Sequence, residues 1–211
     1  MLLFLLVSLG LLSVRSSPVE ESALTSVRRI DANTPVEIQS ALALSAGPPI
    51  AAGASVYVLG PKGYSKVKDG TNGFSCLVTR DRVDEVAPQC FDAEGSATTL
   101  RYYLYLEEQR ALGVDSKEIQ KAVEEGYKAG RFKAPNKPGI VYMLSPYNYL
   151  ADVVTGHIEH FPGHLMFYAP YATSGDVGTG PDAPYIGEPG TARALMIVVP
   201  RSSSRSDTHA P

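Results

Sequence analysis

Histidines are the one concentrated chemical signal in this chain, because three of its four histidines lie within eight residues. An imidazole can transfer a proton near neutral pH or bind a transition metal through a ring nitrogen. The three are His157, His160 and His164, and the carboxylates of Asp152 and Glu159 lie close to them in sequence. This cluster has the composition of a metal site, so its spacing decides whether it can form one.

The spacing fits one shared metal ion poorly. A continuous helix would bring the three histidines to one face, but Gly156, Pro162 and Gly163 interrupt it. On an extended strand, His160 and His164 share a face but lie about 13 Å apart, whereas two zinc ligands place their nitrogens about 2 Å from the ion. We therefore expect no metal and no cofactor. A tight bend at Pro162 and Gly163 is the arrangement that would assemble the cluster.

His164 is the best candidate for a single functional side chain. It begins an expected strand, and a histidine on a half-buried strand face is most often packed with a hydrogen-bond partner, so we favour a structural role. We expect Asp176 to accept a hydrogen bond from its ring. The alternative is a hydrolase or metal-dependent enzyme in which His164 acts with a carboxylate such as Asp176 or Glu159.

Common catalytic and nucleotide-binding motifs are absent from the sequence. It contains neither the G-x-S-x-G turn of esterases nor the H-E-x-x-H helix of metalloproteases. The glycine-rich stretch 175–180 lacks the Lys-Ser/Thr pair of a P-loop, so we interpret it as a surface loop. A net charge of −3 gives no reason to expect nucleic-acid binding.

The chain contains two cysteines, Cys76 and Cys90. Neither has a partner at the short spacing that metal-binding and redox motifs require. In an oxidising compartment the two would pair and close a loop of about 15 residues, which stabilises the fold by roughly 3 kcal/mol on the chain-entropy model. We therefore predict a structural disulfide.

The first residues predict an export signal. Residues 2–12 form an apolar run of about 11 residues, whereas a membrane-spanning helix needs roughly 20. Small residues follow, so we expect a signal peptide at 1–16 that is cleaved near Ser16. The protein would then be secreted or periplasmic. No later stretch is long and apolar enough to span a membrane.

The rest of the chain predicts one domain at 35–200, between a loose segment at 17–34 and a disordered, Ser-rich tail at 201–211. Turn signals and alternation favour a β-meander over 55–79, followed by two helices and several later strands. The expected fold class is α+β, a mostly antiparallel sheet packed by two or three helices. The expected helices are 36–44, one that begins at Asp92 or Ser96 and runs to Leu112, and 115–130. The expected strands are 55–59, 64–68, 74–79, 139–145, 153–154, 157–161, 164–168 and 194–199.

Four sequence blocks resemble a family of exported bacterial proteins of unknown function. The resemblance covers about residues 37–200 and implies an exported bacterial domain without supplying an activity. The family pattern commonly has a proline before its last block, where this chain has Gly163 and places Pro162 one residue earlier. The blocks are NGFSC (72–76), PQCFD (88–92), GIVYML (139–144) and HLM (164–166).

These observations favour a non-catalytic binding or structural domain of the cell envelope, whose partner the sequence does not identify. The alternatives are the enzyme centred on His164 and a small-ligand carrier lined by tyrosines. The carrier hypothesis is based on the composition of 12 tyrosines and no tryptophan. Tyrosine rings with their polar tips suit half-buried positions.

Overall fold

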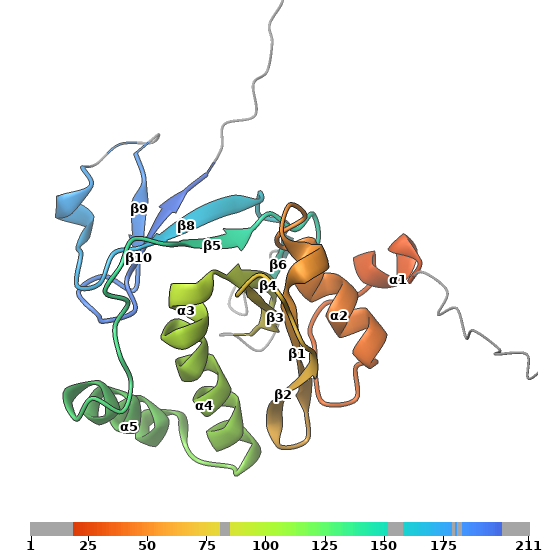
Figure 1. Ribbon diagram of the computed structural model, residues 1–211, viewed down its shortest axis with the longest axis horizontal. Coiled ribbons are helices and arrows are strands. Elements are labelled where there is room, and N and C mark those ends of the chain that lie inside the picture. Colours follow the sequence, from red (N-terminus) through yellow and green to blue (C-terminus); the bar gives the residue numbers. More distant parts are fainter. Residues whose placement is uncertain (1–18, 81–84, 152–157, 179, 181–182, 200–211) are drawn as a thin grey trace, which may run out of the picture.

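The computed structural model describes residues 19–80, 85–151, 158–178, 180 and 183–199, and Figure 1 shows how they are arranged. A mostly antiparallel sheet lies at the centre with helices on both of its faces, which confirms the predicted α+β fold. The main helices are α1 (Glu21–Thr25), α2 (Val36–Ser45), α3 (Ala93–Ala97), α4 (Thr99–Ala111) and α5 (Ser116–Lys128). The strands are β1 (Ser55–Gly60), β2 (Gly63–Lys68), β3 (Ser75–Thr79), β4 (Glu85–Phe91), β5 (Ile140–Met143), β6 (Tyr149–Ala151), β7 (Ile158–Glu159), β8 (His164–Tyr168), β9 (Tyr185–Gly187) and β10 (Leu195–Val198).

The strands follow the order β2-β1-β3-β4-β5-β8-β10-β9, with β6 paired to β4 and β7 paired to β6. β1 and β3 run parallel, and the other pairs of described strands are antiparallel. The expected β-meander is therefore wrong in its order, because β1 rather than β2 lies beside β3. Two backbone hydrogen bonds explain this strand order. The Ser55 N–H donates to the Phe74 carbonyl at 2.8 Å and the Thr71 N–H to the Gly53 carbonyl at 2.7 Å, so the chain returns along the other edge of β1.

Alternation along the strands divides the core between the two faces of the sheet. On one face, Cys76, Val78 and Cys90 pack in a cluster with the buried side of α2. On the other face, Leu77 and Phe91 pack in a cluster with the buried side of α4. Figure 1 shows α2 and α4 on opposite sides of these strands. β3 is buried along its whole length because both of its faces are covered.

The predicted disulfide is present. Cys76 and Cys90 lie directly opposite each other on β3 and β4, and their sulfur atoms are bonded at 2.02 Å. Both residues are fully buried. The bond therefore joins two neighbouring central strands beneath α2.

Side-chain caps define where the helices begin. Asp115 accepts a hydrogen bond from the Lys117 N–H at 2.8 Å, which confirms the predicted start of α5. The helix expected at 92–112 is instead two helices. Asp92 caps α3, and Thr98, with φ −118° and ψ −80°, ends it and turns the chain into α4. Local pattern did not indicate this break because apolar spacing continues across it.

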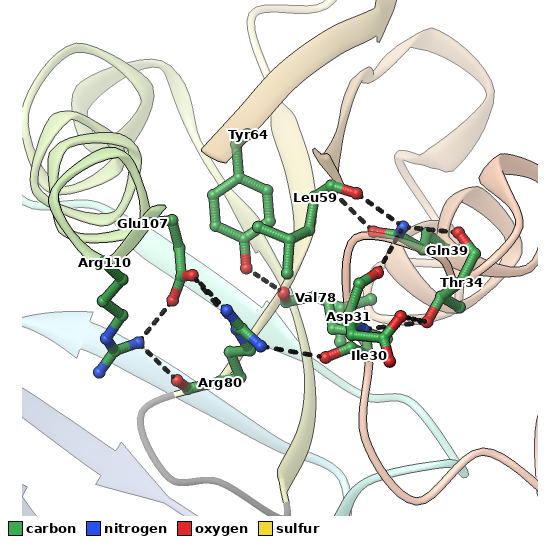
Figure 2. Close-up of polar contacts among 10 residues, drawn as sticks. All are labelled: Ile30, Asp31, Thr34, Gln39, Leu59, Tyr64, Val78, Arg80, Glu107 and Arg110. Atoms are coloured by element: carbon green, nitrogen blue, oxygen red, sulfur yellow. Dashed lines mark hydrogen bonds and ion pairs between the residues drawn. The ribbon is translucent and has the colours of Figure 1, made fainter. Parts of the chain in front are cut away.

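The N-terminal segment expected to be loose is packed where the structure describes it, from residue 19. Ile30 is fully buried, and its carbonyl accepts a hydrogen bond from the Arg80 guanidinium at 3.4 Å. The same guanidinium donates to the Glu107 carboxylate at 2.8 Å, and Arg110 donates to the other oxygen of that carboxylate at 2.5 Å (Figure 2). This polar cluster connects the segment to the end of β3 and to α4.

A buried glutamine closes the open edge of β1. β1 pairs with β3 at Ser55 and Val56, and Leu59 lies beyond that pairing. Gln39 of α2 bonds to both backbone groups of Leu59: its Nε2 donates to the carbonyl at 3.0 Å, and its Oε1 accepts from the N–H at 2.7 Å (Figure 2). The side-chain amide thus takes the place of a neighbouring strand, with its own polar atoms satisfied.

In the part of the chain that the structure describes, no helix is long and apolar enough to cross a membrane. The expected signal peptide (1–16) and the expected tail (201–211) lie outside the described residues.

Candidate functional site

A cavity of about 390 Å³ lies between α4 and the sheet. Its wall includes side chains from α4, from the central strands β4, β5 and β8, and from the segment that joins β9 to β10. Tyr185 and Glu188 belong to the lining and are exposed, so the cavity opens to solvent beside β9. The lining residues include Glu85, Gln89, Tyr103, Met143, His164 and Arg193.

Strand register explains how distant residues meet in this cavity. Met143 lies opposite His164 in the β5–β8 pair, and Phe91 lies opposite Val141 in the β4–β5 pair. Because side chains two residues apart share a face, Gln89 points to the same side of the sheet as Met143 and His164. Three of the blocks that carry the family resemblance, PQCFD, GIVYML and HLM, therefore each contribute a lining residue.

Hydrogen bonds from Tyr168 and Ile140 to Asp92, together called the anchor, fix the start of α3 against β5 and β8. Tyr168 donates to Asp92 Oδ1 at 3.1 Å, and the Ile140 N–H donates to Asp92 Oδ2 at 2.8 Å. Burial, and then the Asp92 carboxylate, raise the pKa of Tyr168, so its hydroxyl stays protonated as a donor. A Cβ at Gly95 would lie 1.8 Å from the Tyr168 oxygen, and one at Gly139 would lie 2.3 Å from Asp92 Oδ2. Only glycine fits at both positions.

Gln89 holds an amide oxygen that has no partner. The residue is 5% exposed, and its Nε2 donates to Thr79 Oγ1 at 2.7 Å. The Thr79 hydroxyl donates its single proton to the Ala87 carbonyl at 3.0 Å, so it must accept from Gln89, and this fixes which way the amide faces. Gln89 Oε1 is buried and unpaired.

His164 is neutral and has one ring nitrogen available. Its Nδ1 lies 2.9 Å from the Pro162 carbonyl oxygen, which can only accept, so Nδ1 carries the proton. Burial lowers the pKa of His164, which favours the uncharged ring at neutral pH. Nε2 has no hydrogen-bond partner among the described residues, so its lone pair can accept a hydrogen bond. The bend at Pro162 and Gly163 makes the Nδ1 contact possible, and it brings Gly163 against the Leu144 backbone, where a Cβ would lie 3.0 Å from Cα.

Arg193 and Glu188 form an ion pair at the mouth of the cavity. Arg193 Nη2 lies 2.5 Å from Glu188 Oε2, and the guanidinium carbon lies 4.2 Å from the centre of the Tyr102 ring. Arg193 Nε is buried without a hydrogen-bond partner. Three buried side-chain atoms of the described residues lack a partner, and two of them, Gln89 Oε1 and Arg193 Nε, belong to residues that line this one cavity.

Asp176 does not contact His164, so the expected hydrogen bond between them is wrong. Asp176 Oδ2 accepts from the Thr173 N–H at 2.7 Å and from the Thr173 hydroxyl at 2.9 Å, which caps the short 3-10 helix Ser174–Asp176. These hydrogen bonds lower the pKa of Asp176. The local cap satisfies the carboxylate, and the Pro162 carbonyl takes its place beside the histidine ring.

The remaining histidines do not join His164 in this cavity where they are described. His160 is exposed and lies edge-on to Tyr149, with ring centres 5.7 Å apart. His157, Asp152 and the side chain of Glu159 lie outside the described residues. Within the described part of the chain, no group of three His, Cys, Asp or Glu side chains could hold a metal ion.

The sequence did not single out Gln89 or Arg193. Gln89 could have been noticed as the one amide in β4, a strand otherwise buried and largely apolar. Arg193 has no such local signal. Comparison of the chain with protein-family models, with curated proteins and with solved structures found no significant match. Its function must therefore be inferred from the cavity itself.

Proposed function

We propose that this protein is an exported, non-catalytic domain that binds a small polar ligand in the cavity between α4 and the sheet. The observation that carries the proposal is the unpaired, buried Oε1 of Gln89, which shares the lining of this cavity with His164, whose Nδ1 is bound to the Pro162 carbonyl. A ligand that donates hydrogen bonds would satisfy both Gln89 Oε1 and His164 Nε2.

Two buried glutamines differ in how fully their side-chain amides are hydrogen-bonded. Gln39 is 1% exposed and its amide is fully engaged, whereas Gln89 is almost as buried and its oxygen is not. An unpaired buried acceptor costs about 1–3 kcal/mol. An apolar side chain at this position would avoid that cost, so a polar one is best explained by a partner that arrives with the ligand.

The geometry supports binding better than catalysis. In a nucleophile–histidine pair, a third group orients the histidine so that it can activate a nearby serine or cysteine. Here the Pro162 carbonyl orients His164, and the described lining of the cavity contains neither serine nor cysteine. The enzyme alternative would therefore require His164 to activate a water molecule or to react with the substrate directly.

Export is supported by three independent features. The apolar run at 2–12 has the length of a signal peptide, the disulfide suits an oxidising compartment, and the four sequence blocks resemble exported bacterial proteins. A secreted or periplasmic location would expose the cavity to nutrients and cell-envelope metabolites.

The test is a thermal-shift screen of the mature protein against amino acids, amines, sugars and organic acids. A ligand present at 100 times its Kd adds about 2.7 kcal/mol of stability, which corresponds to a rise in Tm of about 5–10 °C for a domain of this size. We expect the rise to fall by about half in Gln89→Leu, for a tenfold loss of affinity, and to remain in Gln120→Leu, a matched change at an exposed position of α5. A screen without hits, or hits whose rise in Tm is unchanged in Gln89→Leu, would contradict the proposal. Chemical conversion of a hit would replace it with the enzyme alternative.

A further inference from the structure

The lining of the cavity offers an acceptor and a donor that both lack partners. Gln89 Oε1 can only accept a hydrogen bond and Arg193 Nε can only donate one. The two side chains come from different parts of the cavity wall, Gln89 from β4 and Arg193 from the segment before β10. A complementary ligand therefore carries a donor group and an acceptor group rather than one of them alone.

The charges of the lining indicate the kind of donor. Glu85 contributes a carboxylate to the same wall as Gln89, and the neutral His164 contributes a second uncharged acceptor. An ammonium group has three N–H donors and no acceptor, so it suits this side of the cavity. Tyr103 and Phe161 also line the cavity, and aromatic rings attract cations as well as apolar groups.

The acceptor side of the ligand follows from Arg193. Its Nη2 is bound to Glu188, so the ion pair holds the guanidinium in place while Nε remains unpaired. A carboxylate accepts from a guanidinium N–H more strongly than a neutral oxygen does. Between the polar groups, Met143 and Met166 provide a polarizable apolar wall.

The size of the cavity limits the ligand. Water occupies about 30 Å³ per molecule in the liquid, so 390 Å³ corresponds to the space of about 13 water molecules. That space suits a molecule of roughly a dozen non-hydrogen atoms, or an end of that size in a larger ligand.

Building on the binding function proposed above, we infer that the ligand is a zwitterion with an apolar side chain, either a free amino acid or a very short peptide. Its ammonium group would bind on the Gln89 and His164 side, and its carboxylate would bind to Arg193.

Calorimetric titration with four related probes tests this inference on the wild-type protein. The probes are L-phenylalanine, glycyl-L-phenylalanine, 2-phenylethylamine, which lacks the carboxylate, and 3-phenylpropionate, which lacks the ammonium group. We expect one of the two zwitterions to bind at least about tenfold more tightly than either singly charged probe. The two zwitterions differ in the separation of their charges, so the tighter one shows whether an amino acid or a peptide fits.

Two variants assign each end of the ligand. Gln89→Leu should weaken the zwitterion and 2-phenylethylamine about tenfold and leave 3-phenylpropionate unchanged. Arg193→Lys keeps a cation near Glu188 but removes Nε–H, so it should weaken the zwitterion and 3-phenylpropionate and leave 2-phenylethylamine unchanged. The matched controls are Gln120→Leu and Arg101→Lys, both exposed.

Equal or tighter binding of a singly charged probe to the wild-type protein would overturn the zwitterion assignment. If that probe still loses affinity in Gln89→Leu, the proposed binding function stands and only the ligand class is wrong. If all four probes fail, the assignment is also wrong, and the broader thermal-shift screen then decides the binding function separately. The ranking of the four probes on the wild-type protein decides the ligand class even if Arg193→Lys does not fold.

Discussion

Replacing either of the two buried glutamines with leucine should have opposite effects on stability. Gln89→Leu removes an unpaired amide oxygen, which should raise the free energy of unfolding by about 1–3 kcal/mol. It also removes one neutral hydrogen bond to Thr79, which should lower that free energy by about 0.5–1.5 kcal/mol. The volumes of the two side chains are similar, so no large cavity forms. We therefore expect Gln89→Leu to be neutral or to stabilise the empty protein by up to about 2 kcal/mol.

Gln39→Leu removes an amide that is satisfied on both sides. It would leave the N–H and the carbonyl of Leu59 without these partners, and both contacts are buried (Figure 2). At about 1–3 kcal/mol for each of these two buried groups, the expected loss is about 2–6 kcal/mol. The Thr34 carbonyl, which also accepts from Gln39, is less costly because water can reach it.

Urea unfolding of the wild type and the two variants, with the disulfide intact, measures this difference. The midpoint should rise or stay unchanged in Gln89→Leu and fall clearly in Gln39→Leu, with similar m-values. A loss in Gln89→Leu as large as that in Gln39→Leu would refute the reasoning, because it would show that Gln89 Oε1 already has a partner in the unliganded protein. Gln89 would then have no missing partner for a ligand to supply.

Three further outcomes follow from the same structure. Thiol labelling of the denatured, non-reduced protein should modify neither cysteine, and Cys90→Ser should cost roughly 3 kcal/mol; two reactive thiols in native material would contradict the disulfide. Glu107→Gln should cost about 3 kcal/mol, the low end of the range for a broken buried ion pair because Arg80 and Arg110 retain some exposure, whereas the exposed Glu108→Gln should change little; equal effects would contradict the role of the cluster. Because burial lowers the pKa of His164, the unfolded chain takes up a proton first as the pH falls below about 6.5, and stability is lost until the lower folded pKa is passed. His164→Gln should remove that component, at most about 1.4 kcal/mol per pH unit, and an identical pH profile would show that His164 does not cause it.

The sequence predicted most of the strands and the disulfide because those features depend on local pattern. Alternation of buried and exposed side chains indicates a strand wherever one face is covered, and two cysteines without metal-binding or redox spacing have few other roles. The strands expected at 139–145 and 164–168 are present as β5 and β8, which pair antiparallel from Ile140 to Met143. The cap at Asp115 also depends on neighbouring residues alone.

The error in strand order arose because residues far apart in the sequence decide which strands pair. The order β2-β1-β3 depends on the bond between Ser55 and Phe74 and on the packing of Gly70, where a Cβ would lie 2.3 Å from the Ser55 nitrogen. The assignment of Asp176 to His164 failed for the opposite reason. A local capping box with Thr173 competes for that carboxylate, and its Thr-x-x-Asp spacing was present in the sequence.

The proposed binding site and its supporting anchor come from the same short sequence blocks. Gln89 and Asp92 are three residues apart in PQCFD, one in the cavity wall and the other bound to Tyr168 and to the start of β5. The anchor therefore fixes β4, β5 and β8 relative to one another, and with them Gln89, Met143 and His164. A site held in this way loses little conformational entropy when a ligand binds, which favours affinity. The unpaired amide oxygen of Gln89 is then a stable feature of the empty site, because the strands that carry it cannot rearrange to satisfy it.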